Sequence, residues 1–143
     1  MEQNITNIDF SKGNGIVPVI VQDANTKEIL TLAYSNKESL ERTLSTGNSW
    51  FWSRSRKKIW HKGKVSGFIQ KVKEIRIDDD QDSVWLSVDI GDGASCHVGY
   101  KSCFYRKLSD KDGNYSNKLE FVEKKKVFDP KKIYSKTPNP TKL

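Results

Sequence analysis

Two clusters of residues that could bind metal ions lie on either side of one short stretch of the chain. The first is the acidic run 78–82, with carboxylates at Asp78, Asp79, Asp80 and Asp82. The second spans 95–103 and holds His97 and the only two cysteines, Cys96 and Cys103. Apolar residues alternate between them, from Val84 to Ile90, as in a strand with one buried face. The only cysteines therefore stand one strand away from the densest acidic run, which suggests a metal site.

The two clusters suit different metals. If the acidic run is extended, Asp78, Asp80 and Asp82 project to one side and Asp79 to the other. Three carboxylates on one side form an oxygen-rich pocket for a hard cation such as Mg²⁺. Cysteine thiolates are ligands that zinc takes, and catalytic zinc needs three protein ligands and an open position. Two cysteines leave that set incomplete, and His97 and Asp79 are the nearest candidates for the third ligand.

Both clusters also have simpler explanations. An acidic run at the end of a strand is usually a solvated turn. Two cysteines with the spacing of Cys96 and Cys103 are more often buried apolar residues or a disulfide than metal ligands. Spacing alone leaves these alternatives open.

The order of the motifs resembles the phosphoribosyl-AMP cyclohydrolase family of histidine biosynthesis. The resemblance runs through residues 15–107 and includes Trp52-Ser53-Arg54-Ser55-Arg56, Trp60-His61-Lys62-Gly63, Ser66-Gly67, the acidic run, and Cys96-His97 with Ser102-Cys103-Phe104-Tyr105. It implies an α+β fold of mainly antiparallel strands with one or two short helices, working as an intertwined homodimer. The implied reaction is hydrolytic opening of the purine ring of phosphoribosyl-AMP between N1 and C6.

The resemblance also implies roles for the two clusters. Zinc is held by Asp79 of one subunit and by Cys96 and Cys103 of the other. Magnesium is held by Asp78, Asp80 and Asp82, where it binds or orients the substrate. His97 is the expected general base or proton shuttle, since its ordinary pKa of about 6.5 suits that work.

A basic segment upstream supplies the expected substrate ligands. Hydroxyl groups interleaved with guanidinium groups are good phosphate ligands, although a basic hairpin turn is the simpler interpretation of the same residues. In the family this region helps to form the substrate pocket. The candidate substrate-binding residues are Ser53, Arg54, Ser55, Arg56, Trp60, Lys62 and Ser66.

Four positions depart from the family pattern. Asp79 stands where the family has its first zinc-binding cysteine, and Lys64 stands where a glutamate is usual. Phe68 replaces a histidine or asparagine, and Val98 replaces a threonine. A carboxylate can still bind zinc, as a harder ligand. These departures keep open a diverged homologue that takes another nucleotide, or that binds without this reaction.

Composition limits the other possibilities. The chain has 143 residues, a net charge of +7 and a pI of about 9.4, which suggest one domain with an anionic partner. The same charge, with four tryptophans, leaves a nucleic-acid-binding module as a less favoured alternative. We see no long apolar run and no signal-peptide pattern, so no membrane partner is expected. Two cysteines in such a chain indicate a reducing, cytoplasmic setting.

The expected elements follow from periodicity and turn residues. Residues 1–14 form a polar lead-in, and strands are expected at 17–22, 28–34, 50–52, 68–77 and 84–90. A helix should follow the capping box Ser35-x-x-Glu38, bury Leu40 and Leu44, and end at Gly47. After the cyclohydrolase-like domain, 15–107, residues 108–123 add a hairpin or strand. Residues 124–143 form a basic, proline-containing tail, either an arm ordered on contact or a disordered segment.

Overall fold

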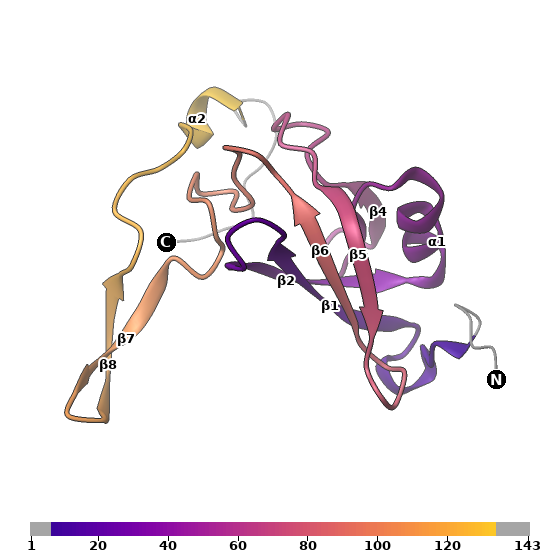
Figure 1. Ribbon diagram of the computed structural model, residues 1–143, viewed down its shortest axis with the longest axis horizontal. Helices are drawn as coiled ribbons and strands as arrows, with labels where there is room; N and C mark the ends of the chain where they lie inside the picture. Colours follow the sequence, from indigo (N-terminus) through magenta and orange to yellow (C-terminus); the bar gives the residue numbers. More distant parts are fainter. Residues whose placement is uncertain (1–6, 134–143) are drawn as a thin grey trace.

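A four-stranded mixed sheet is the centre of the protein. The computed structural model describes residues 7–133, and its strands β1 (Ile16–Asp23), β2 (Ile29–Asn36), β5 (Lys71–Ile77) and β6 (Val84–Asp89) are ordered β2-β1-β6-β5. The β1–β2 and β5–β6 pairs are antiparallel, whereas β1 and β6 run parallel in the middle (Figure 1). The lead-in contributes the short 3-10 helix η2 (Ser11–Gly13).

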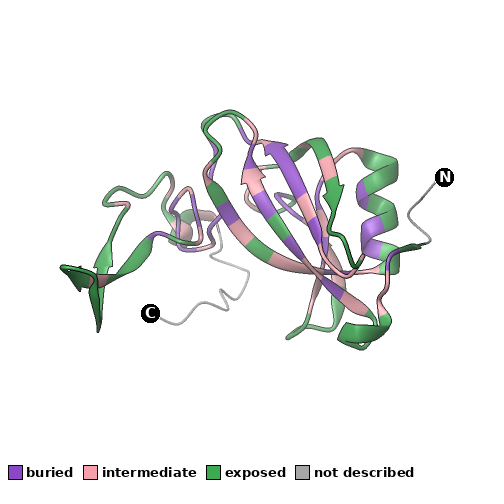
Figure 2. Ribbon diagram, turned by 60° about the horizontal axis from the view of Figure 1, so that its bottom comes forward, coloured by how far each residue is buried: buried purple, intermediate pink, exposed green. Residues whose placement is uncertain are grey.

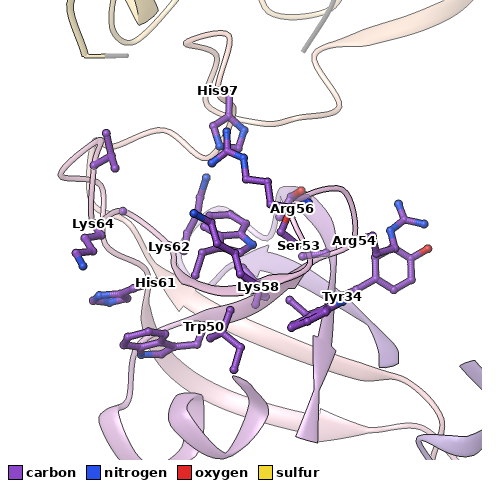
Figure 3. Close-up of a pocket in the computed structure, with 18 of the residues that line it drawn as sticks. Tyr34, Trp50, Ser53, Arg54, Arg56, Lys58, His61, Lys62, Lys64 and His97 are labelled. Atoms are coloured by element: carbon purple, nitrogen blue, oxygen red, sulfur yellow. The ribbon is translucent and has the colours of Figure 1, made fainter. Parts of the chain in front are cut away.

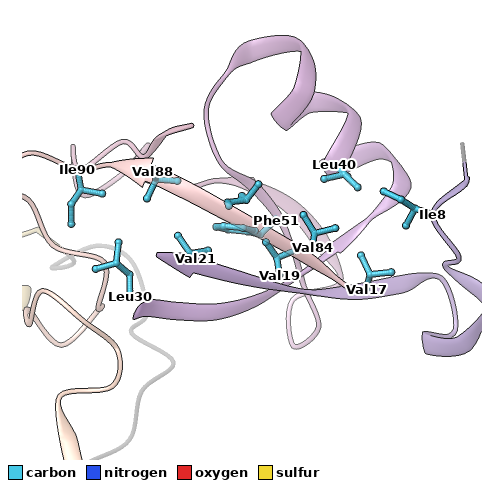
Figure 4. Packing of buried hydrophobic residues seen from close by; sticks show 11 residues of the cluster. Ile8, Val17, Val19, Val21, Leu30, Leu40, Phe51, Val84, Val88 and Ile90 are labelled. Carbon is cyan, nitrogen blue, oxygen red and sulfur yellow. The ribbon is translucent and has the colours of Figure 1, made fainter. Parts of the chain in front are cut away.

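One face of this sheet carries the hydrophobic core. Val17, Val19 and Val21 of β1 are at most 1% exposed, because the period of two turns all three to the same face. Leu40 of the helix α1 (Lys37–Thr46) and Phe51 pack onto them from outside the sheet (Figure 4). The core therefore holds the helix, and the strand that follows it, against the sheet.

The helix begins one residue later than the sequence suggested. Its N-cap is Asn36, whose side chain accepts the Ser39 amide while Ser39 Oγ accepts the Asn36 amide. The prediction of a box from Ser35 to Glu38 is wrong: β2 continues through Asn36, so the cap falls one residue later. The helix ends at Gly47 as expected, with φ at 73°. Thr43 faces the core, while Leu44 is 43% exposed.

Two hairpins complete the fold. The first joins β3 (Trp50–Ser53) to β4 (Lys58–His61), and the second joins β7 (Arg106–Lys111) to β8 (Asn114–Phe121). Asp112 and Gly113 both have positive φ, as a tight two-residue hairpin turn requires. The β7–β8 hairpin projects from the body, and almost all of its residues are exposed (Figure 2). A short helix, α2 (Pro130–Ile133), ends the described part of the chain.

The α+β class with mainly antiparallel strands and short helices is confirmed. The strand expected at 68–77 begins only at Lys71, because residues 68–70 are irregular. Residues 124–133 of the expected tail are mostly exposed, and the rest of it lies outside the described residues. Among residues 7–133, no helix has both the length and the apolar character that a membrane span requires.

Candidate active-site pocket

A pocket of about 710 Å³ lies between the β3–β4 hairpin, β2 and the loop that follows β6 (Figure 3). A volume of this size suits a nucleotide-sized ligand. Its lining includes His97 and Cys103 from the loop after β6. It also includes all seven residues expected to bind substrate: Ser53, Arg54, Ser55, Arg56, Trp60, Lys62 and Ser66. The structure thus brings the basic segment and part of the second ligand cluster to one cavity.

The charge of the lining has a single sign. The lining residues include no aspartate or glutamate. Six of them are cationic: Arg42, Arg54, Arg56, Lys58, Lys62 and Lys64. A partly enclosed site with one sign of charge concentrates ligands of the opposite charge. The pocket therefore favours an anion, and its arginine forks suit phosphate groups.

The tip of the β3–β4 hairpin is the basic turn that the sequence allowed. Lys57 takes a positive φ of 52° there, and Ser53 Oγ accepts the Arg56 amide. The turn leaves Arg54 and Arg56 exposed on the rim of the cavity. The hairpin turn and the anion-binding wall are thus the same element.

Aromatic rings give the pocket flat surfaces. The Arg54 guanidinium lies 3.9 Å from the centre of the Tyr34 ring, which comes from β2. Trp50 and His61 stack at 4.5 Å with 7° between their planes, and the Arg42 guanidinium lies over the Trp50 ring, 5.1 Å from its centre. Flat stacked rings beside cations suit a base or a sugar phosphate.

Lys62 is the most enclosed cation of the site. It is only 5% exposed, and its ammonium donates to the Ser95 carbonyl at 2.5 Å. Gln70, fully buried, donates to Ser95 Oγ at 3.1 Å. Lys62 therefore ties the β4 end to the residue just before Cys96, which sets it apart from the exposed phosphate candidates Arg54 and Arg56.

His97 is half-buried beside Trp60, with ring centres 6.0 Å apart. Burial, and then the positive charges of Lys62 and Arg56, lower the pKa of His97 to about 4. The surroundings of His97 therefore move its pKa below the ordinary value on which its expected role was argued. The imidazole is neutral at physiological pH and can accept a proton or a hydrogen bond there.

We expect an NMR titration of the metal-free protein to give His97 a midpoint near 4, and Lys62→Met to raise it by removing a neighbouring charge. The unfolded chain protonates histidine near 6.5, so the folded state should lose stability as pH falls from about 6.5 towards 4. Lys107→Met, on the exposed β7 strand, is the matched control and should leave the midpoint unchanged. A midpoint above 6 in wild type would contradict this assignment.

The two cysteines form a coupled pair. Both are free thiols, Cys96 buried and Cys103 half-buried. The hydrogen bond from the Cys96 thiol lowers the pKa of Cys103 to about 6, and the Lys62 ammonium contributes. The same contact, with burial, raises the pKa of Cys96. Cys103 is therefore a thiolate at neutral pH, the form that binds metals.

The acidic run gathers three carboxylates at the turn between β5 and β6. Ligand atoms of Asp78, Asp80 and Asp82 lie within 4.8 Å of one another. They meet through a turn in which Gln81 has a positive φ of 65°, instead of through the extended segment that the sequence suggested. Lys12 of η2 reaches this turn, with its ammonium 3.3 Å from Asp80 and 3.2 Å from Asp82.

Asp79 and the cysteines stand at opposite ends of β6 in the sequence. Asp79 precedes this six-residue strand and Cys96 follows it, so about 20 Å of extended chain lies between them. Among the described residues of one chain, the group of three side chains close enough to bind one ion is Asp78, Asp80 and Asp82, and it includes neither Asp79 nor a cysteine. Asp79 and the two cysteines of a single chain therefore do not share a metal.

The remaining departures from the family pattern have different surroundings. Lys64 is exposed and lines the pocket. Phe68 packs on Phe128 with ring centres 5.2 Å apart. The apolar side chain at position 68 therefore has an apolar partner from the C-terminal segment. Val98 is buried, and its amide donates to Cys96 Sγ at 3.4 Å.

Sequence reasoning missed several contributors to this site besides the stacked pair Trp50 and His61. Tyr34 lies on β2, Arg42 on α1, and Lys58 at the start of β4. Lys58 lies within the basic hairpin itself, but nothing in the spacing of Tyr34 and Arg42 relates these two residues to it. A regular pattern could place each on an element, but only the packing of β2, α1 and β3 brings them to one cavity.

Comparison with known proteins gives one consistent result. The chain matches the phosphoribosyl-AMP cyclohydrolase family model over residues 31–105. It is 58% identical over 108 residues to the phosphoribosyl-AMP cyclohydrolase of Cenarchaeum symbiosum, covering 76% of this chain and 99% of the relative. It is 51% identical over 129 residues to that of Desulfatibacillum aliphaticivorans, covering 90% and 98%. The corresponding protein of Rhodopseudomonas palustris strain TIE-1 is 48% identical over 123 residues, covering 86% and 81%.

Proposed function

The chain belongs to the phosphoribosyl-AMP cyclohydrolase family, and from this premise we propose that it opens the purine ring of phosphoribosyl-AMP by hydrolysis in histidine biosynthesis. The cut bond lies between N1 and C6. The observation that carries the proposal is the pocket, whose lining joins six cations, stacked aromatic rings and His97. A phosphorylated nucleotide offers the charge and the flat base that such a lining suits.

The residues present suit the two metals that the family implies. The thiolate of Cys103, with Cys96 beside it, is a donor set that zinc takes, and Asp79 of a second chain would supply the third ligand. The turn with Asp78, Asp80 and Asp82 would hold Mg²⁺. When bound, zinc would act as a Lewis acid and lower the pKa of a water molecule bound to it.

The remaining steps belong to this chain's own side chains. Arg54 and Arg56 bind phosphate at the rim, and the stacked Trp50–His61 pair offers a face to the base or ribose. The neutral imidazole of His97 takes the proton from the attacking water. It then returns this proton to the purine N1 as the N1–C6 bond breaks. Lys62 holds Ser95, and with it the start of the His97 loop.

The separation of Asp79 from the cysteines within one chain supports a homodimer as the working unit. Each zinc site would then need two copies. The thiolate chemistry of the pair also requires a reducing compartment, and we place the protein in the cytoplasm on this ground.

A diverged homologue remains the second candidate, and Phe68 favours it. Where the family carries a hydrogen-bonding side chain, Phe68 offers only a ring, and Lys64 brings an added positive charge to the pocket. Such a protein would bind a nucleotide with a different base without opening phosphoribosyl-AMP.

Ring opening is measured by the change in ultraviolet absorbance with Zn²⁺ and Mg²⁺ present. We expect turnover by the wild type. If the wild type is inactive, the variant Asp79→Cys with Lys64→Glu and Phe68→His should be active in its place, because it restores the family residues. Inactivity of both proteins would reject cyclohydrolase function and favour the diverged homologue.

A further inference from the structure

The segment that follows the β7–β8 hairpin donates backbone hydrogen bonds to one loop. After β8 the chain returns past the loop between Ala94 and Tyr105, which carries both cysteines and His97 (Figure 1). The amide of Val122 donates to the Tyr105 carbonyl at 2.8 Å. Further on, the Val127 amide donates to the Gly99 carbonyl at 2.6 Å. This segment, 122–128, lies outside the part of the chain that matches the family model.

Glu123 makes the most specific of these contacts. One carboxylate oxygen accepts the Lys101 amide at 3.0 Å, and the other accepts the Ser102 amide at 2.9 Å. Hydrogen bonds to a charged acceptor are short and strong, and two in parallel fix an orientation as well as a distance. The two amides lie directly before Cys103, so the carboxylate sets the direction in which the chain enters that residue.

The loop is built to accept this contact. Gly99 has φ at 108°, and a Cβ there would come within 2.4 Å of the Phe128 carbonyl oxygen. The Ser102 hydroxyl donates to the Ile29 carbonyl at 2.7 Å, so the loop is held by β2 on one side and by Glu123 on the other. Both Cys103 and His97 line the pocket from this loop.

The segment contributes little to the core. Val122 is 59% exposed and Val127 is 44% exposed, so their burial adds little to the free energy of unfolding. Its polar contacts concentrate on the loop. Loss of these hydrogen bonds should therefore change the orientation of the loop with little effect on the free energy of unfolding.

We propose that Glu123 is a positioning residue: by holding the Lys101 and Ser102 amides it orients Cys103 and the loop that presents His97 to the pocket. The proposal rests on the proposed function for its kinetic part only. The β3–β4 hairpin that binds phosphate lies elsewhere in the pocket wall, so loss of Glu123 should affect the chemical step more than binding.

The test compares Glu123→Ala, Glu123→Gln and Glu120→Ala. Glu120 is the matched control, because its carboxylate accepts a hydrogen bond from Ser109 within the hairpin and not from the loop. In metal-free protein we expect Glu123→Ala to speed deuterium exchange at Lys101 and Ser102 and to change the rate of Cys103 alkylation by iodoacetamide. In the enzyme we expect kcat to fall about ten- to hundredfold with KM nearly unchanged.

Glu123→Gln keeps one acceptor oxygen, so it should restore part of each effect. Equal exchange and equal alkylation in Glu123→Ala and Glu120→Ala would overturn the proposal, as would an equal kcat. If the wild type proves to be no cyclohydrolase, the exchange and alkylation rates still decide whether Glu123 orients Cys103. A loss of the proposed function is thereby distinguished from a failure of this inference.

Discussion

Replacing His97 by alanine is expected to lower kcat by roughly a hundred- to ten-thousandfold, because the site then lacks its neutral proton acceptor. The rim arginines proposed to bind phosphate are untouched by this change, so KM should stay close to the wild-type value. Steady-state ring opening, followed by ultraviolet absorbance, measures both constants.

His61→Ala serves as the comparison, since His61 stacks on Trp50 in the wall of the same pocket. We expect this variant to raise KM more than it lowers kcat. If His97→Ala keeps more than a tenth of the wild-type kcat, His97 carries no proton in the rate-limiting step, and the assignment of its role is wrong.

Two inactive variants are expected to restore each other when mixed. Asp79→Ala and Cys103→Ser should each bind no zinc as a pure protein, because each site would lack one ligand. After subunit exchange, about half of the dimers are mixed, and each of these has one intact site of two. Metal analysis and activity should therefore return to about a quarter of the wild-type values.

The double variant Asp79→Ala with Cys103→Ser is the matched control, since mixing it with itself restores nothing. Recovery to a quarter requires ligands from two chains, and it follows from the positions of Asp79 and Cys96 at opposite ends of β6. Zinc retained in full by pure Cys103→Ser would reject the thiolate as a ligand. No recovery on mixing would reject Asp79 as the partner ligand.

The alternation of residues along the chain predicted most of the sheet. Val17 to Gln22 lie in β1, and Val84 to Asp89 form β6, one residue shorter than expected, because an alternating apolar face has few other stable conformations. The α+β class was implied by the family resemblance, and these strands, with the helix that ends at Gly47, agree with it. The parallel pairing of β1 with β6 was not predictable, because local patterns carry no information about which strands meet.

The sequence predicted the part of the site whose residues are close together in the chain, and missed contacts between distant segments. Ser53, Arg54 and their neighbours are consecutive in sequence, so a hairpin keeps them together. The burial of Lys62 depends on the loop at Ser95, which packs on it from 33 residues away in the sequence. Local reasoning therefore grouped Lys62 with Arg56 as a substrate ligand and could not show that Lys62 is buried. The capping box was misplaced by one residue because local preference does not show that β2 continues through Asn36.

The parallel pairing of β1 and β6 also sets the order in which the protein can fold. The ladder joins Val19 to Val84, residues that are 65 positions apart, whereas β1 and β2 are neighbours joined by a short turn. The β1–β2 hairpin can form as soon as it leaves the ribosome, but the sheet stays incomplete until the chain has been made past β6. During that interval the edge of β1 is unpaired and open to other strands. We therefore expect nascent chains that end before β6 to stay bound to chaperones. Chains that extend beyond Tyr105 should fold and dissociate from the chaperones.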